Sequence, residues 1–147
     1  MNRSERLEFN RRNIDEFRSS GGRIASFGDA TMLLLTTTGA SSGLARTSPL
    51  AYLADEHDPN RVYVFASAAG QDENPAWFDN LVAKPNDLVV EIGTDRIAAV
   101  AEVVPEPRRS EIYERQAARS QSFAAYQEKT ARRIPVVALS LHRNPPA

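Results

Sequence analysis

Short apolar runs separated by polar turns predict six β-strands along most of the chain. The first run is Met32 to Leu35, which is continuous and therefore typical of a strand buried on both faces. Alternation of apolar and polar positions is clearest on either side of Gly93-Thr94-Asp95, and this pattern indicates a β-hairpin. The predicted strands span residues 31–38, 48–54, 61–67, 88–92, 97–104 and 134–141.

Helical spacing and helix-stop signals predict four helices between and before these strands. Asn74 is expected to cap one of them, with Pro75 at its first helical position and Pro85 after its end. Pro105 and Pro107 precede another. The predicted helices lie within residues 1–23 and over residues 76–84, 108–119 and 122–132.

This order of elements predicts a mainly β fold with helices (α+β). Strands joined by short turns pair antiparallel, and the inserted helices fall between strands three and four and between strands five and six. We therefore expect a small six-stranded β-barrel with helical covers, not a doubly wound sheet. The expected organisation is an N-terminal helical segment (1–22), a barrel domain (23–141) and a tail (142–147).

Composition narrows the class of protein. The 147 residues are enough for one domain with a core, and a net charge of −1 provides no basic field for binding nucleic acid. The absence of cysteine excludes disulfides, a thiol nucleophile and thiolate metal sites. The two histidines, His57 and His142, lie in a turn and near the tail, so no metal site is predicted.

The chain shows no apolar stretch long enough for a signal peptide or a membrane span, which favours a cytoplasmic location. The slightly basic N-terminal helix carries Leu7, Ile14 and Phe17 near one face. We expect it to pack on its own domain. The alternative is a weak contact with the anionic inner face of the cell membrane.

A loop rich in glycine and serine follows the first strand and ends in an arginine. Two glycines four residues apart are expected to adopt φ > 0 and turn backbone amides inward, two serine hydroxyls add donors, and the arginine adds a cation. Such a loop is also typical of a plain hairpin turn. If the loop instead forms a cradle for an anion such as phosphate, the residues expected to bind it are Gly39, Ser41, Ser42, Gly43 and Arg46.

Other small and aromatic residues are candidates for holding a flat ring. The segment Ser67-Ala68-Ala69-Gly70 is small enough for a ring to approach the backbone, although a tight turn explains it equally well. Trp77 could cover a ring while Asn80 supplies an amide, and Phe123 and Tyr126 could form a wall. No Ser-His-Asp triad is predicted, so an enzyme of this sequence would obtain its chemistry from a cofactor.

Taken together, the motifs resemble a known family over roughly residues 20 to 141. The ordered matches are Leu34-Leu35-Thr36-Thr37-Thr38-Gly39, Ser42-Gly43, Arg46, Pro49-Leu50, Ala66-Ser67, Gly70, Pro75-Ala76-Trp77, Asn80-Leu81, Pro85, Tyr126, Lys129-Thr130, Arg132 and Ile134-Pro135-Val136-Val137. This pattern closely resembles the deazaflavin-dependent nitroreductases of actinobacteria. The resemblance implies an FMN-binding-like split β-barrel that binds the deazaflavin coenzyme F420 and transfers hydride to a quinone, an enone or a nitroaromatic compound.

The resemblance also implies roles for residues. Tyr126 and Ser67 are the implied catalytic residues, and Phe123 and Tyr126 face the acceptor. Ser41 stands where many members carry a lysine, and Ser120 and Phe123 stand at positions that often hold tyrosine. The implied coenzyme contacts are Gly39, Ser41, Ser42, Gly43, Arg46, Ser48, Pro49, Ala66, Ser67, Ala68, Ala69, Gly70, Trp77 and Asn80.

Two other functions fit the same motifs. One is an FMN-dependent split-barrel oxidoreductase, and the other is a carrier that binds F420 without catalysis. The motifs leave the oligomeric state open.

Overall fold

The computed structural model describes residues 2–143 and forms a closed six-stranded barrel with helices on its outer surface. The strands are β1 (Met32–Thr38), β2 (Ala45–Ala54), β3 (Arg61–Phe65), β4 (Leu88–Ile92), β5 (Asp95–Val103) and β6 (Val136–Leu141). Their order around the barrel is β1-β2-β3-β6-β5-β4, and every neighbouring pair is antiparallel. Closure leaves no free sheet edge, and the predicted barrel is confirmed.

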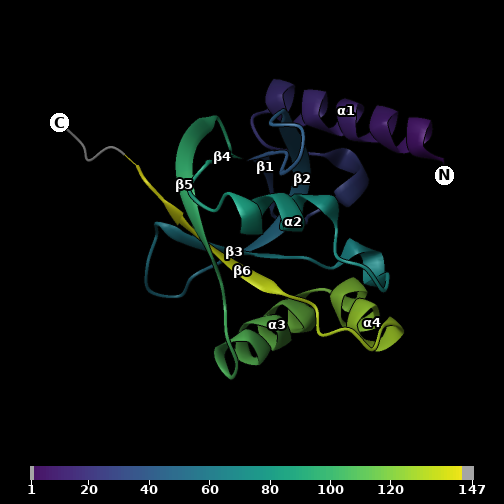
Figure 1. Cartoon of the computed structure of the whole chain (residues 1–147), viewed down its shortest axis with the longest axis vertical. Helices are drawn as coiled ribbons and strands as arrows, with labels where there is room; N and C mark the ends of the chain where they lie inside the picture. The colour runs from purple at the N-terminus through teal and green to yellow at the C-terminus, as the bar shows by residue number, and fades with distance from the viewer. Residues whose placement is uncertain (1, 144–147) are drawn as a thin grey trace.

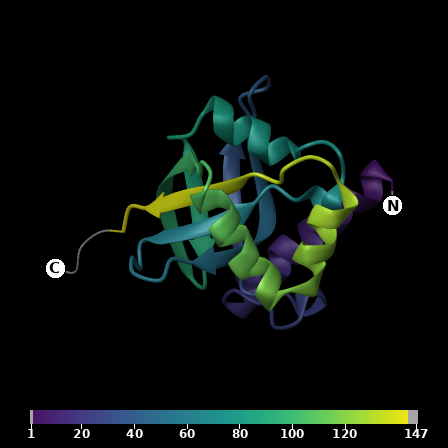
Figure 2. The same cartoon turned by 90° about the horizontal axis from the view of Figure 1, so that it is seen from below.

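Within the described residues, four α-helices and two short 3-10 turns cover the barrel (Figures 1 and 2). In Figure 1, α1 lies along the upper side of the barrel, and α3 and α4 lie together below β6. The helices are α1 (Arg3–Ser20), α2 (Ala76–Ala83), α3 (Arg108–Arg119) and α4 (Gln121–Lys129), and the turns are η1 (Ala25–Phe27) and η2 (Ala68–Gly70). No helix within residues 2–143 combines the length and apolar character needed to cross a membrane.

Coverage by helices explains why β1 is apolar on both faces. Leu33 and Leu35 point into the barrel, whereas Leu34 packs outside against Phe17 of α1. Arg18 further ties the end of α1 to β4 through two hydrogen bonds to Glu91, at 3.0 and 2.9 Å. Phe17 is 1% exposed, so α1 buries its main apolar contact against the barrel.

The same reasoning applies to β6. Val137 and Leu139 fill the barrel interior, and Val136 lies outside beneath Ile112 and Tyr113 of α3. By contrast, β5 alternates in its first half, where Ile97 and Ala99 are buried in the barrel and Arg96 and Ala98 are exposed on the outer face.

Several boundaries and one cap differ from the sequence prediction; β5 begins at Asp95, β6 begins at Val136 and α4 ends at Lys129. Strand β2 begins at Ala45, three residues early, because Ala45 and Arg46 pair with Thr38 and Thr37 of β1. Strand β3 ends at Phe65. Helix α2 begins at Ala76 without the expected Asn74 cap, because the Asn74 carboxamide oxygen accepts a hydrogen bond from Arg132 instead. Residues 144–147 of the predicted tail lie outside the described residues.

Candidate functional site

The loop between β1 and β2 is closed by its own hydrogen bonds. The Gly39 amide donates to the Leu44 carbonyl at 2.8 Å, and the Gly43 amide donates to the Gly39 carbonyl at 2.9 Å. Of the two glycines in this loop, Gly43 has a positive φ, at 71°, and Gly39 does not, so the expectation of positive φ at both is wrong. At Gly39, an added Cβ would meet the Ser42 hydroxyl oxygen, so a larger residue there would require the Ser42 side chain to rotate away.

Asn80 of α2 holds this loop from below. Its Oδ1 accepts from the Ala40 amide at 3.0 Å, and its Nδ2 donates to the buried Thr37 hydroxyl at 3.4 Å. Both ends of the carboxamide that was expected to serve a bound ring are therefore engaged within the protein. Asn80 shapes the loop and still borders the cavity next to it.

An open cavity of about 530 Å³ lies between this loop, β2, α2 and α1; we call it the anion cavity. Arg46 projects from β2 rather than from the loop, and its exposed side chain makes no hydrogen bond or ion pair within residues 2–143. Asp79 is the acidic residue of the wall. The lining residues are Leu7, Asn10, Gly39, Ala40, Ser41, Ser42, Arg46, Thr47, Ser48, Ala76, Trp77, Asp79 and Asn80.

A second cavity, of about 390 Å³, lies on the other side of β2 and includes several aromatic residues in its lining; we call it the ring cavity. Ser48 and Pro49 are consecutive on β2, and they line the anion cavity and the ring cavity respectively. The residues that line the ring cavity are Ser26, Phe27, Ala30, Met32, Pro49, Leu50, Ala51, Phe65, Ser67, Ala69, Ser120, Ser122, Phe123 and Tyr126.

The turn that carries Ser67 is strained. Ala68 and Ala69 have φ of 45° and 53°, a region in which L-residues cost about 1–2 kcal/mol each. Gly70 follows with φ of 80°, and a Cβ on it would lie 2.9 Å from the Tyr126 carbonyl oxygen of α4. The turn is thus pressed against α4, which sets the spacing between Ser67 and the aromatic wall.

Arg132 holds the turn in this shape. Its guanidinium donates to the carbonyl oxygens of Ala66 at 3.0 Å, Ser67 at 3.0 Å and Gln71 at 2.8 Å. It also donates to Asn74 Oδ1 at 2.7 Å. A planar, five-donor fork suits this ring of acceptors, so we assign Arg132 as a positioning residue. Arg132 is one of the motif positions that carry the family resemblance, which implies no role for it.

Aromatic side chains form the wall opposite the turn. The Phe123 ring contacts the rings of Phe65 and Tyr126 edge to face, each at a centroid distance of 5.4 Å. The Tyr113 hydroxyl donates to the Phe123 carbonyl oxygen at 2.6 Å, and burial raises the pKa of Tyr113 to about 12. Tyr113 therefore stays protonated as a structural donor, and Tyr126 is the phenol on the ring cavity.

The structure brings most of the proposed site residues to these two cavities, but not all. Ala66 is 0% exposed within the barrel core, and Gly70 is buried against α4. Gly43 and Ala68 shape their turns without lining either cavity. Contacts of these four residues with a coenzyme stay predictions, because none of the four lines either cavity. Trp77 is 7% exposed and lines the anion cavity.

No group of three or more His, Asp or Glu side chains within residues 2–143 is arranged to hold a metal ion.

Comparison with known proteins gives a consistent result. Residues 9–140 match the family model described as F420H(2)-dependent quinone reductase. A Mycobacterium tuberculosis protein named F420H(2)-dependent quinone reductase is 33% identical over 132 residues, covering 84% of each chain. Another protein of that species, provisionally given the same name, is 38% identical over 107 residues, covering 73% of this chain and 87% of its own.

Solved structures share the fold. The F420-H2 dependent reductase FDR-A has a TM-score of 0.66 at 29% identity, covering 75% of this chain and 94% of its own. HutZ, a heme storage protein of Vibrio cholerae, has a TM-score of 0.58 at 15% identity, covering 89% of each chain, and supports the barrel fold alone.

Proposed function

Because this chain belongs to the F420H(2)-dependent quinone reductase family, we propose that its two cavities hold reduced coenzyme F420 and a planar acceptor, to which a hydride passes. As a member of this family, the protein is an oxidoreductase. What we propose is which cavities bind the coenzyme and the acceptor, and which class of acceptor is reduced. The observation that carries it is that Arg46, a cation with no ion pair within residues 2–143, lines a cavity that adjoins a second cavity with aromatic walls.

The residues present fit such a coenzyme. An anionic tail needs hydrogen-bond donors and a cation, and the anion cavity offers Arg46 together with the hydroxyls of Ser41 and Ser48. A flat ring needs close approach to small residues, and Pro49 and Ala69 provide this at the ring cavity. When bound, reduced F420 supplies a hydride from its ring.

The remaining steps belong to the chain's own residues. Reduction of a quinone to a hydroquinone takes up one hydride and one proton, and the Tyr126 hydroxyl is the candidate donor of that proton. Ser67 lies on the same cavity and is the second candidate. Phe65, Phe123 and Met32 line the cavity, exclude water and hold a planar acceptor by contact with its face.

Parallel titrations of the purified protein with oxidised F420 and with FMN test this proposal. We expect F420 to bind and FMN to bind more weakly, followed by reoxidation of F420H2 when a menadione-type quinone is added. Tighter binding of FMN would favour an FMN-dependent oxidoreductase. Binding of F420 without turnover of any quinone, enone or nitroaromatic acceptor would favour a carrier.

We further expect a planar quinone or cyclohexenone to be reduced faster than a nitroimidazole. Ser120 and Phe123 stand where related proteins often have tyrosines, so fewer hydroxyls remain to orient a nitro group, while Phe123 still packs on a flat ring.

Replacing Tyr126 with phenylalanine should slow turnover about 10- to 100-fold and leave the Kd for F420 nearly unchanged.

The measurement is loss of F420H2 absorbance with each acceptor in turn. Faster reduction of the nitroimidazole would contradict the selectivity. Equal rates for wild type and Tyr126→Phe would remove Tyr126 from the reaction.

A weak contact of α1 with an anionic membrane surface and a cytoplasmic location stay predictions. Phe17 is buried against the barrel, and the exposed Leu7 borders the anion cavity. These positions support the expectation that α1 packs on its own domain.

A further inference from the structure

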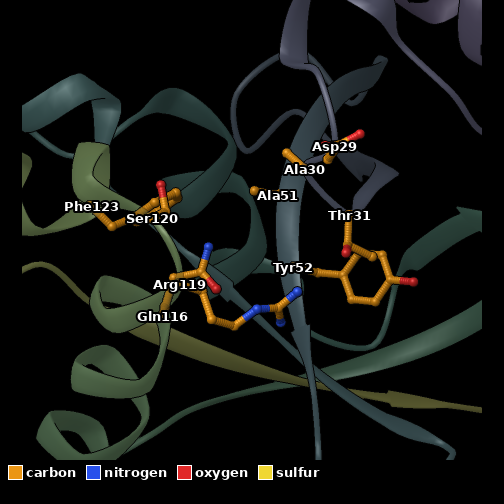
Figure 3. A pocket seen from close by; sticks show the side chains of 9 residues that line it. All are labelled: Asp29, Ala30, Thr31, Ala51, Tyr52, Gln116, Arg119, Ser120 and Phe123. Atoms are coloured by element: carbon orange, nitrogen blue, oxygen red, sulfur yellow. The ribbon is translucent and has the colours of Figure 1, made fainter.

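A third cavity, of about 270 Å³, opens beside the ring cavity (Figure 3). Four residues belong to both walls: Ala30, Ala51, Ser120 and Phe123. A ring that packs on Phe123 therefore has direct access to this side cavity through its substituents. The other lining residues are Asp29, Thr31, Tyr52, Gln116 and Arg119.

Two polar side chains of this side cavity, Gln116 and Arg119, have groups without partners among residues 2–143. Gln116 of α3 is 5% exposed, and its Oε1 is enclosed without a hydrogen-bond donor among residues 2–143. A buried amide oxygen left unpaired costs about 1–3 kcal/mol, so the site gains from any ligand that supplies a donor. The terminal torsion of glutamine is soft, and a turn about it presents Oε1 to the cavity.

Arg119 lies one turn further along α3, and its guanidinium extends across the cavity toward Tyr52 (Figure 3). It forms no ion pair or hydrogen bond in the part of the chain that the structure describes. Burial raises the pKa of Tyr52, which keeps that phenol neutral. Asp29, the acidic residue of the wall, points away from Arg119 in Figure 3.

An unpaired acceptor beside an unpaired donor matches the chemistry of a hydroxyl group. A hydroxyl can donate its hydrogen to Gln116 Oε1 while its oxygen accepts from Arg119. We propose that the side cavity is a specificity subsite that recognises a hydroxyl carried on a short arm of the planar acceptor. This inference rests on the proposed function, because it takes the acceptor ring to lie in the ring cavity.

The two residues then play separable roles. Gln116 distinguishes a hydroxyl from an ether, since only the hydroxyl donates. Arg119 distinguishes either oxygen from a methylene, since both oxygens accept. Three naphthoquinones of nearly equal reduction potential separate these roles: one with a hydroxyethyl arm, one with a methoxyethyl arm and one with a propyl arm.

The test compares kcat/KM ratios among the three probes, with F420H2 as reductant. In the wild type we expect the hydroxyethyl probe to exceed the methoxyethyl probe about tenfold. Gln116→Leu should bring that ratio close to one. Arg119→Met should lower the ratio of the methoxyethyl probe to the propyl probe about threefold or more.

Glu114→Leu is the matched control, because Glu114 is exposed on the same helix and lines none of the three cavities. It should retain the wild-type ratios. Equal kcat/KM for all three probes in the wild type would contradict the proposed subsite. An unchanged ratio of the hydroxyethyl to the methoxyethyl probe in Gln116→Leu would contradict it as well. Such a result would leave the proposed function standing as long as the propyl probe is reduced, whereas failure to reduce any probe would count against both.

Discussion

Replacing Arg132 with alanine is expected to lower kcat for quinone reduction about 100-fold. Its guanidinium is the side-chain donor that joins the carbonyls of Ala66, Ser67 and Gln71, so its loss removes three hydrogen bonds from a turn with strained φ angles. A displacement of about 1 Å at a reacting surface can reduce a rate by this factor. The same change should lower the free energy of unfolding by about 3 kcal/mol.

Arg133 provides the matched control. It is the next residue, its side chain is 69% exposed, and its contact is a surface ion pair with Glu106. Arg133→Ala should change both kcat and stability little. Arg132→Lys should recover only part of the rate, since an ammonium cannot reach the acceptors as a planar fork can. If Arg132→Ala and Arg133→Ala gave the same kcat at a temperature where both are folded, the positioning role would be wrong.

Replacing Arg46 with alanine is expected to weaken F420 binding by about 1.5–3 kcal/mol, which raises the Kd about 10- to 150-fold. Arg46 is the cation among the residues that line the anion cavity. The Arg46 backbone pairs with Thr37 of β1, so the substitution should leave the fold intact. Fluorescence titration with oxidised F420 measures the change.

Arg23→Ala is the control for general charge, since Arg23 is exposed and lines neither the anion cavity nor the ring cavity. Its Kd should match that of the wild type. An unchanged Kd in folded Arg46→Ala protein would show that the anionic tail of the coenzyme lies elsewhere.

Much of the candidate site could be predicted from local sequence. The glycine and serine loop, Pro49, Ser67 and the pair Phe123 and Tyr126 are recognisable because each lies in a short motif with its own turn or helical spacing. The structure places these residues on two adjoining cavities.

Other contributions depended on contacts between distant segments. Arg132 reaches residues about sixty positions earlier in the chain, and Asn80 reaches Ala40. Gln116 looks like an ordinary polar residue of a helix until the fold buries it without a partner. No local pattern reports such pairings, because a hydrogen bond between segments leaves no periodicity in the sequence.

By itself, the sequence determined the strands, the helices and the antiparallel barrel. Apolar periodicity and turn residues act over a few positions, and burial of the apolar positions favours one arrangement of the resulting elements. Tertiary structure alone decided that β1 and β4 and β3 and β6 pair to close the barrel, and that Arg46 stands on a strand. It also decided that the carboxamides of Asn74 and Asn80 form hydrogen bonds, whereas the carboxamide oxygen of Gln116 has no donor among residues 2–143. Those outcomes depend on where distant side chains meet, and that is fixed only once the barrel closes and the helices pack on it.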